Sequence, residues 1–246
     1  MRPTTKVRCV VCKARCVPAV DEKHRTFTES GRAGRDGLPA RCIAYFSPKD
    51  FGRQSAMVFY EHAGLRRLLP LVQFAVSRDR CRHVAIAAHF GETIPPCGAN
   101  CDVCAPSADA EAAPPVADLS AHAASLVATA RELEAAGRSA SVLQLIDAWR
   151  KSKRAETAAL ARSMRADDAE VFVCRLVLEN VLTQKFSSTA YATNVYITAG
   201  SAAAAVTAGR LAVRLPLRVQ AEGGKRKRAA PAAAAAVADD SDSDFQ

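Results

Sequence analysis

Three cysteines fall within eight residues of this chain, and their spacing constrains its fold more than any other feature. Cys97, Cys101 and Cys104 form a short knuckle, and Cys81 precedes them on a segment that we expect to be helical. Zinc in structural sites binds four thiolate or imidazole ligands in a tetrahedron, with Zn–S distances of about 2.3 Å. A knuckle brings its thiolates together at a small entropic cost. The spacing therefore predicts a structural zinc site rather than a group of buried free thiols.

The fourth ligand of this site has three candidates. Cys81 would close the tetrahedron and attach the knuckle to the preceding helix, whereas His83 and His89 are rival donors. His83 lies two residues from Cys81, so the two side chains would point to different sides of one helix. Whichever residue binds, the protein fills all four positions and leaves no open coordination for catalysis.

The chain is basic, with a net charge of +9 over 246 residues and a pI of about 9.3. This charge favours a polyanionic partner, but it does not by itself separate nucleic acid from a membrane surface. No run of about 18 apolar residues occurs, so we predict no membrane-spanning helix and no membrane partner. The amino terminus does not resemble an export signal, so disulfides are not expected. We interpret Cys9, Cys12 and Cys16 as three unrelated thiols.

Apolar spacing predicts a short strand and three helices in the first half of the chain. The segment RCIAYF, residues 41–46, has the apolar and aromatic content of a strand. Residues 50–77 show helical spacing, and either Gly64 or Pro70 divides them into two helices. A third short helix is expected from Cys81 to Phe90.

The second half of the chain shows helices followed by strands, which is the pattern of a winged helix-turn-helix domain. Asp167 or Asp168 is the expected N-cap of the third helix. The apolar face of the second helix is expected to consist of Val142, Leu143, Ile146 and Trp149. The predicted elements are helices over 119–136, 139–154 and 167–182, and strands over 182–187, 191–198 and 210–217.

A glycine-rich segment, residues 29–37, carries Arg32 and Arg35. Arginine binds phosphate through paired N–H groups and can neutralise charge that develops on a γ-phosphate. The same spacing occurs in solvated turns and in RNA-binding repeats. The residues alone therefore leave a phosphate role and a solvated turn open.

The segment TESGRAGRDGLPARCIAYFSPKD resembles the last conserved motor motif of RecQ-family DNA helicases, where the pattern is QESGRAGRDG. The resemblance implies that Arg32 and Arg35 reach the γ-phosphate of ATP, bound with Mg²⁺, in a complete motor. Thr28 stands where the family has glutamine, which alters one contact of the motif. The segment CRHVAIAAHFGETIPPCGANCDVC resembles the zinc-binding module of the same family. This second resemblance implies four zinc ligands, namely Cys81, Cys97, Cys101 and Cys104.

The segments VLQLIDAWRKSK and RLVLENVL resemble the RQC domain of that family, a winged helix that binds duplex DNA and inserts a hairpin at a fork. The resemblance implies that Lys151, Ser152 and Lys153 bind phosphate at a helix end. Tyr191, near the tip of the expected hairpin, would stack on a terminal base pair. The alternatives are a solvated helix end and an ordinary strand aromatic. Lys151 stands where the family often has glycine.

The expected fold class is mixed α/β: the remnant of a RecA-like motor lobe, a helical zinc-binding module, a winged helix-turn-helix domain of α+β type and a disordered tail. The motor remnant carries the arginine motif, and the zinc-binding module includes a helical hairpin. Residues 1–26 receive no assignment. The expected boundaries are 27–48 for the motor remnant, 49–105 for the zinc-binding module, 106–118 for a linker, 119–219 for the RQC-like domain and 220–246 for the tail.

These resemblances indicate the C-terminal portion of a RecQ-like ATP-dependent 3′-to-5′ DNA helicase that acts in recombination, repair and replication. The portion would supply a zinc scaffold and bind duplexes, forks and junctions. The sequence contains no G-x-x-x-x-G-K-[ST] loop and no DEAH-like box, so we expect no ATPase activity from the chain alone. The alternatives are a stand-alone, non-enzymatic zinc and winged-helix DNA-binding protein and a zinc-dependent protein-interaction module.

The carboxyl-terminal tail combines a basic run with an acidic one. Lys225–Arg228 is interpreted as a nuclear import signal or a phosphate-binding patch, with a solvated tail as the alternative. Ser241 and Ser243 lie among aspartates, a context that can accept phosphorylation. The tail is therefore expected to direct the protein to the nucleus and to contact repair proteins.

Overall fold

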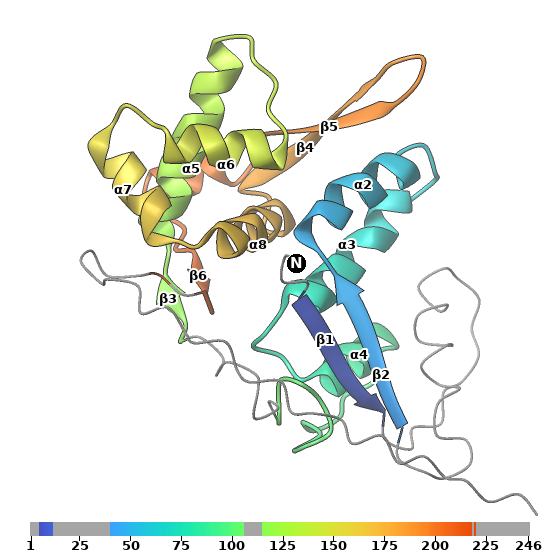
Figure 1. Ribbon diagram of the computed structural model, residues 1–246. Helices are drawn as coiled ribbons and strands as arrows, with labels where there is room; N and C mark the ends of the chain where they lie inside the picture. The colour runs from blue at the N-terminus through green and yellow to red at the C-terminus, as the bar shows by residue number, and fades with distance from the viewer. Residues whose placement is uncertain (1–4, 12–39, 106–114, 218, 220–246) are drawn as a thin grey trace, which may run out of the picture.

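The computed structural model describes residues 5–11, 40–105, 115–217 and 219 (Figure 1). Arg32, Arg35, the disorder expected of 220–246 and the two charged runs of that segment lie outside the described residues. Within them, the chain is a mixed fold of helices with three small antiparallel sheets of two strands each. None of the helices in these ranges has the length and apolar character needed to cross a membrane.

The first sheet pairs β1 (Thr5–Val11) with β2 (Ala40–Phe46) in antiparallel register, with Thr5 opposite Phe46. Strand β2 confirms the strand predicted over residues 41–46. Strand β1 falls in a segment to which the sequence assigns no element. Its pairing with β2 crosses a long sequence separation, and such pairing leaves no local pattern from which it can be predicted.

The helical part that carries the cysteines consists of α2 (Pro48–Val58), α3 (Gly64–Val76) and α4 (Arg82–His89). The break between α2 and α3 ends at Gly64, where an added Cβ would lie only 2.1 Å from the carbonyl oxygen of Val58. The alternative division at Pro70 is wrong, because Pro70 lies inside α3. The buried side chains of Val72 and Val76 hold that helix against the core and outweigh the loss of one backbone hydrogen bond.

The remainder is a bundle of helices with a long hairpin. Its elements are β3 (Ala117–Asp118), α5 (Ser120–Ala135), α6 (Val142–Arg150), α7 (Ala155–Ser163), α8 (Ala166–Leu178), β4 (Leu182–Ser188), β5 (Thr193–Ala199), α9 (Ala203–Thr207) and β6 (Arg214–Leu215). The hairpin pairs Leu182 with Ala199 at its base and Ser188 with Thr193 at its outer end. The predicted strand over 182–187 is thereby confirmed, and the one predicted over 191–198 is present but begins at Thr193.

Two local predictions about the helices of this bundle are wrong. Leu143 is 47% exposed, and Leu145 takes its place in the core, because α6 presents a face rotated from the expected one. Arg165, not Asp167 or Asp168, is the N-cap of α8, and both aspartates lie in its first turn, where they favour the positive end of the helix dipole.

The third predicted strand, over 210–217, is reduced to β6. It pairs with β3, at the end of the expected linker, instead of extending the hairpin. Val213, Leu215 and Leu217 are nevertheless buried, so the alternation read from the sequence reflects burial on one face.

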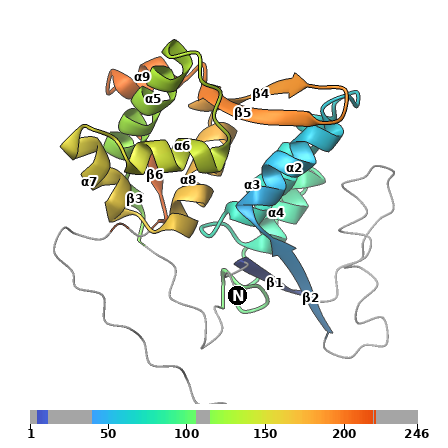
Figure 2. The same cartoon turned by 45° about the horizontal axis from the view of Figure 1, so that its top comes forward.

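One continuous cluster of buried apolar side chains joins the two parts of the chain. Trp149 and Phe172 lie at its centre, where their ring centroids are 6.3 Å apart and both side chains are fully buried. Phe51 of α2 and Val76 of α3 belong to the same cluster and pack toward α8. Figure 2 shows the consequence: α2 and α3 lie alongside the bundle, and the β4–β5 hairpin reaches across to the turn between them.

Candidate metal centre and nucleic-acid surface

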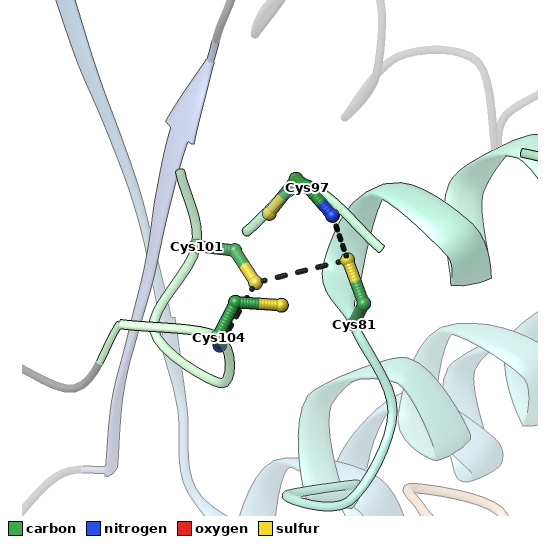
Figure 3. Close-up of side chains that lie close together, drawn as sticks. All are labelled: Cys81, Cys97, Cys101 and Cys104. Carbon is green, nitrogen blue, oxygen red and sulfur yellow. Dashed lines mark hydrogen bonds between the residues drawn. The ribbon is translucent and has the colours of Figure 1, made fainter. Parts of the chain in front are cut away.

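The four predicted cysteines converge on one point. Cys81 is the N-cap residue of α4, and the other three lie on the loop that follows this helix (Figure 3). The four Sγ atoms all lie within 4.8 Å of one another. Backbone N–H groups of the loop point at two of the sulfurs: Cys97 N lies 3.4 Å from Cys81 Sγ, and Cys104 N lies 3.4 Å from Cys101 Sγ.

The size and chemistry of this cluster fit a zinc ion. A tetrahedron with Zn–S bonds of about 2.3 Å has edges of roughly 3.8 Å. The Sγ atoms of Cys81 and Cys101 are 4.0 Å apart, close to that edge. Within the described residues, the clustered ligand atoms come from cysteines, so neither His83 nor His89 joins the set. Four thiolates complete the coordination of a structural ion and leave no site for water or substrate.

The thiols of the cluster ionise differently because they share one small volume. Burial raises the pKa of the Cys81 thiol, but hydrogen bonds from the backbone of Val84 and Cys97 and from the Cys97 and Cys104 thiols together outweigh burial and lower this pKa to about 6. Burial, and next the neighbouring Cys101 thiol, raise the pKa of Cys97. Burial also raises the pKa of Cys104. Zinc binds the thiolate form of cysteine, and thiols whose pKa is raised keep their protons until the metal arrives. Binding of a metal must therefore release protons.

A buried ion pair, which the sequence interpretation did not identify, ties together the two segments that carry the ligands. Arg82 follows Cys81, and Asp102 follows Cys101. The Arg82 guanidinium is 2% exposed and donates from Nε and Nη2 to the two carboxylate oxygens of Asp102, each at 2.9 Å. Its Nη1 donates to the backbone carbonyl of Phe74, and its Cζ lies 5.0 Å from the centroid of the Phe74 ring. The sequence did contain a signal for this pair, because a basic residue follows one predicted zinc ligand and an acidic residue follows another.

The predicted phosphate-binding residues lie at the junction of α6 and α7. Lys151 is the C-cap of α6, and its Nζ lies 2.8 Å from the carboxylate of Asp147 in an exposed ion pair. The Ser152 hydroxyl accepts a hydrogen bond from Arg154 N, the N-cap residue of α7, at 3.2 Å. Lys153 is exposed. An exposed ion pair contributes little to stability, so Lys151 can exchange Asp147 for a phosphate at small cost.

Tyr191 lies in the turn of the hairpin and not in either strand. The turn is closed by a hydrogen bond from Thr189 N to the Ala192 carbonyl oxygen, 2.8 Å long. The Thr189 hydroxyl accepts a further bond from Ala192 N at 3.1 Å. Tyr191 is 99% exposed at this ordered tip. The interpretation of Tyr191 as an ordinary strand aromatic is therefore wrong.

The structure does not bring Tyr191 and the lysines together. Ser141, at the start of α6, lines a groove of about 590 Å³ together with Thr193 and Asn194, the first residues of β5. Lys151 lies at the other end of α6, nine residues along that helix. Figures 1 and 2 accordingly show the outer end of the β4–β5 hairpin and the α6–α7 junction on opposite sides of the molecule.

Comparison with known proteins assigns this architecture to a class. Residues 48–105 match the family model described as RecQ zinc-binding. The chain is 39% identical to ATP-dependent DNA helicase Q-like 2 of Arabidopsis thaliana over 189 residues, which cover 77% of this chain and 26% of the relative. It is 31% identical to ATP-dependent DNA helicase Q1 of Mus musculus over 205 residues, or 81% of this chain and 31% of the relative. The chain therefore corresponds to about a quarter to a third of the length of these relatives.

A more distant relative is ATP-dependent DNA helicase hus2/rqh1 of Schizosaccharomyces pombe, 29% identical over 178 residues that cover 65% of this chain and 13% of that protein. Taken with the geometry of the cysteines, these matches identify residues 48–105 as a RecQ zinc-binding domain that holds a structural Zn²⁺. The chain as a whole is moderately similar to a region of RecQ helicases that includes this domain.

Proposed function

We propose that this chain is the C-terminal portion of a RecQ-like ATP-dependent 3′-to-5′ DNA helicase, and that it binds duplex DNA at forks and junctions. In this proposal the helicase acts in recombination, repair and replication. The domain boundaries at residues 27–48, 49–105, 106–118, 119–219 and 220–246 form part of the proposal. The observation that carries it is Tyr191, which is 99% exposed at the tip of the hairpin, where its ring can stack on a base.

A winged-helix assignment for residues 119–219 draws support from the way the hairpin is attached. Helices α5 to α8 precede β4 and β5 in the chain. Ile197 N of β5 donates to the carbonyl oxygen of Ala140, between α5 and α6, at 2.8 Å. The inter-helix segment thus lies along the edge of the hairpin, which fixes its base to the bundle, and the outer end extends away from the bundle as a wing would.

In the proposed complex, two groups of residues contact different parts of the DNA. The ammonium groups of Lys151 and Lys153, with the Ser152 hydroxyl, bind phosphates of the duplex and set its position. The phenol ring of Tyr191 stacks on the terminal base pair at the fork and competes with the next base pair for that stacking surface. The zinc domain takes no chemical part and serves as a rigid support.

The proposed part of Arg32 and Arg35 is confined to a complete motor. There, their guanidinium groups would neutralise charge on the γ-phosphate of ATP, whose bound Mg²⁺ other motor segments would hold. The chain as given has no phosphate-binding loop sequence. DNA-stimulated ATP hydrolysis by the purified chain would contradict this assignment.

The test of DNA binding is the salt dependence of fork affinity. Each phosphate neutralised by a cation contributes about 0.9 to the slope of log affinity against log salt. The Lys151→Ala/Lys153→Ala chain should therefore lose up to about 1.8 from that slope. The matched control is Lys49→Ala/Arg66→Ala, which removes two exposed cations from α2 and α3. An equal loss in the control, or no loss in the test variant, would reject the α6–α7 junction as a phosphate site.

A second candidate function is a stand-alone zinc and winged-helix DNA-binding protein without enzymatic activity. The four-cysteine centre favours it, because a filled coordination shell leaves no site for water or substrate. An in-frame phosphate-binding loop and DEAH box upstream in the genome would support the helicase instead. Failure to bind any DNA would favour a protein-interaction module.

We also propose nuclear localisation, with Lys225–Arg228 as the import signal and contacts with repair proteins made through the tail. Deletion of residues 220–246 from a fluorescent fusion should then abolish nuclear accumulation. Accumulation that persists without the tail would reject the import signal.

A further inference from the structure

The hairpin contacts the zinc domain close to its outer end. Phe59, the C-cap of α2, stacks on Phe186 of β4 with ring centroids 4.1 Å apart and planes inclined by 13°. The hydroxyl of the adjacent Tyr60 bonds to that of Ser188 on β4 and accepts from the Thr193 hydroxyl on β5, the latter at 3.3 Å. We call these five residues the hairpin clamp.

The clamp contacts the outermost residue pair of the hairpin. Ser188 and Thr193 are the outermost paired residues of the two strands, and the turn that presents Tyr191 begins immediately beyond them. Phe186 and Ser188 are two residues apart on β4, so their side chains lie on one face of the hairpin. The Tyr60 hydroxyl therefore joins both strands where the turn begins, and the Phe59 ring contacts the same face at Phe186, two residue pairs closer to the base.

The side of the clamp on the zinc domain is itself held firmly. Phe59 and Tyr60 begin a tight turn in which Glu61 N donates to the Val58 carbonyl oxygen at 3.1 Å. Gly64 closes the turn and allows α3 to start against the end of α2. Helix α3 then runs to the metal centre, where the Phe74 carbonyl accepts the hydrogen bond from Arg82, the neighbour of a zinc ligand.

The strands between the base and the tip need such support. The hairpin is a sheet of two strands, and an isolated sheet of this kind is at best marginally stable in water. The clamp residues Phe59 and Tyr60 are 38% and 69% exposed, so they lie outside the core and contribute little to its burial. Their contacts restrict the direction of the hairpin more than they stabilise the fold.

We propose that the zinc domain fixes the direction in which the hairpin presents Tyr191, and that Phe59, Tyr60 and Phe186 are positioning residues for this purpose. The inference rests on the proposed contact between Tyr191 and a terminal base pair. It adds a mechanical link to that contact: the metal centre braces α3, α3 places the α2–α3 turn, and the turn holds the hairpin tip against the strand being displaced.

The first measurement is amide hydrogen exchange of the full chain without DNA. Phe186→Ala removes the stack of the two rings. Loss of such a stack should raise the equilibrium constant for opening of the hairpin tip by a factor of roughly three to ten. Exchange over residues 186–195 should rise by about that factor, while exchange in α8 stays unchanged. Tyr60→Phe should raise it less, because only the hydroxyl is lost, and Phe186→Tyr should restore protection because it keeps the ring.

The control for this measurement is Phe90→Ala, which removes another partly exposed aromatic, 43% exposed and at the end of α4. Exchange over residues 186–195 in this control should match that of the unsubstituted chain. Unchanged exchange in both Phe186→Ala and Tyr60→Phe would overturn the proposal, and Tyr60→Phe keeps it testable if removal of Phe186 prevents folding.

The second measurement uses a fork whose terminal base pair carries a fluorescent adenine analogue. Phe186→Ala should lose most of the fluorescence change that the unsubstituted chain produces, as Tyr191→Ala does, while its salt slope for binding stays the same. A full fluorescence change in Phe186→Ala would overturn the positioning role. If Tyr191→Ala itself produces the full change, the proposed function fails, and the exchange experiment still decides whether the clamp orders the tip.

Discussion

At the scale of single residues, His122 of α5 is a buried base with one nitrogen unused. Its Nε2 lies 3.0 Å from the Ser163 hydroxyl, and that hydroxyl already donates to the Leu160 carbonyl oxygen. Nε2 must therefore be the donor, which leaves Nδ1 unprotonated. Nδ1 is buried and has no hydrogen-bond partner among the described residues. A proton added there would bring a charge into an apolar site beside the Trp149 ring.

This arrangement gives the fold a defined pH dependence. Burial lowers the pKa of His122 in the folded chain, whereas the unfolded chain keeps the ordinary value of about 6.5. Between the two values the unfolded state binds more protons, so stability is full above about pH 6.5 and falls as the pH drops below it. We expect the melting temperature to fall more between about pH 7.5 and 5.5 in the unsubstituted chain than in His122→Gln. Equal losses in the two chains would contradict this reasoning.

The Arg82–Asp102 pair leads to a second prediction at this scale. Asp102→Asn keeps the shape of the side chain but leaves the buried Arg82 guanidinium without its counter-charge. Breaking a fully buried pair costs about 3–5 kcal/mol, and the 22% exposure of the Asp102 side chain places this variant near or below the lower limit. Thermal unfolding and competition with a zinc chelator should both show the loss. Asp79→Asn, which alters an exposed carboxylate before Cys81, is the control and should be nearly neutral.

At the scale of elements, local sequence patterns succeeded where the structure depends on neighbours along the chain. Helix α5 ends before Gly137, and α4 before Gly91, both at positive φ as a helix end requires. The hairpin was visible from alternation. Helices α7 and α9 were not predicted, because their alanine-rich sequences contain few large apolar residues at helical spacing. Their positions depend on packing against α5.

Two glycines allow a prediction about the element pair α2 and α3. Gly64→Ala would force a Cβ against the Val58 carbonyl, a backbone atom that cannot rotate away. We expect a loss of about 1–3 kcal/mol in unfolding free energy and faster amide exchange at the hairpin tip. Gly52→Ala, in the middle of α2, meets nothing within 4 Å and should instead stabilise by up to about 1 kcal/mol. Equal effects of the two substitutions would show that the turn tolerates displacement.

At the scale of the whole molecule, the metal centre could be predicted, with its fourth ligand chosen by the family resemblance, and the contacts between its domain and the bundle could not. The ligand cysteines carry their own signal, since three of them are local and the chemistry of zinc demands a fourth. The stack of Phe59 on Phe186 joins residues that are far apart in the sequence. The residues that flank each of these aromatics in the sequence give no sign that the two rings are in contact. The shared core of Phe51 with Trp149 is hidden for the same reason.

That shared core predicts that zinc supports the entire described fold. Phe51, Val72 and Val76 come from the zinc domain, yet they lie in the same buried cluster as Trp149. Trp149 is the only tryptophan of the chain and is fully buried, so its fluorescence reports unfolding of the bundle alone. Removal of zinc should leave α2 and α3 poorly anchored, expose the adjoining side of the bundle to water and lower the melting temperature seen by Trp149.

The measurement compares thermal unfolding by Trp149 fluorescence with and without a zinc chelator, and also in Cys101→Ser with Cys42→Ser as the control outside the metal centre. With zinc bound, fluorescence and circular dichroism should give one coincident transition, because a continuous core unfolds as a unit. If the chelator does not change the melting temperature measured by Trp149 fluorescence, the bundle is stable without the zinc domain. The contact of the hairpin clamp would then be the principal link between zinc and the hairpin tip.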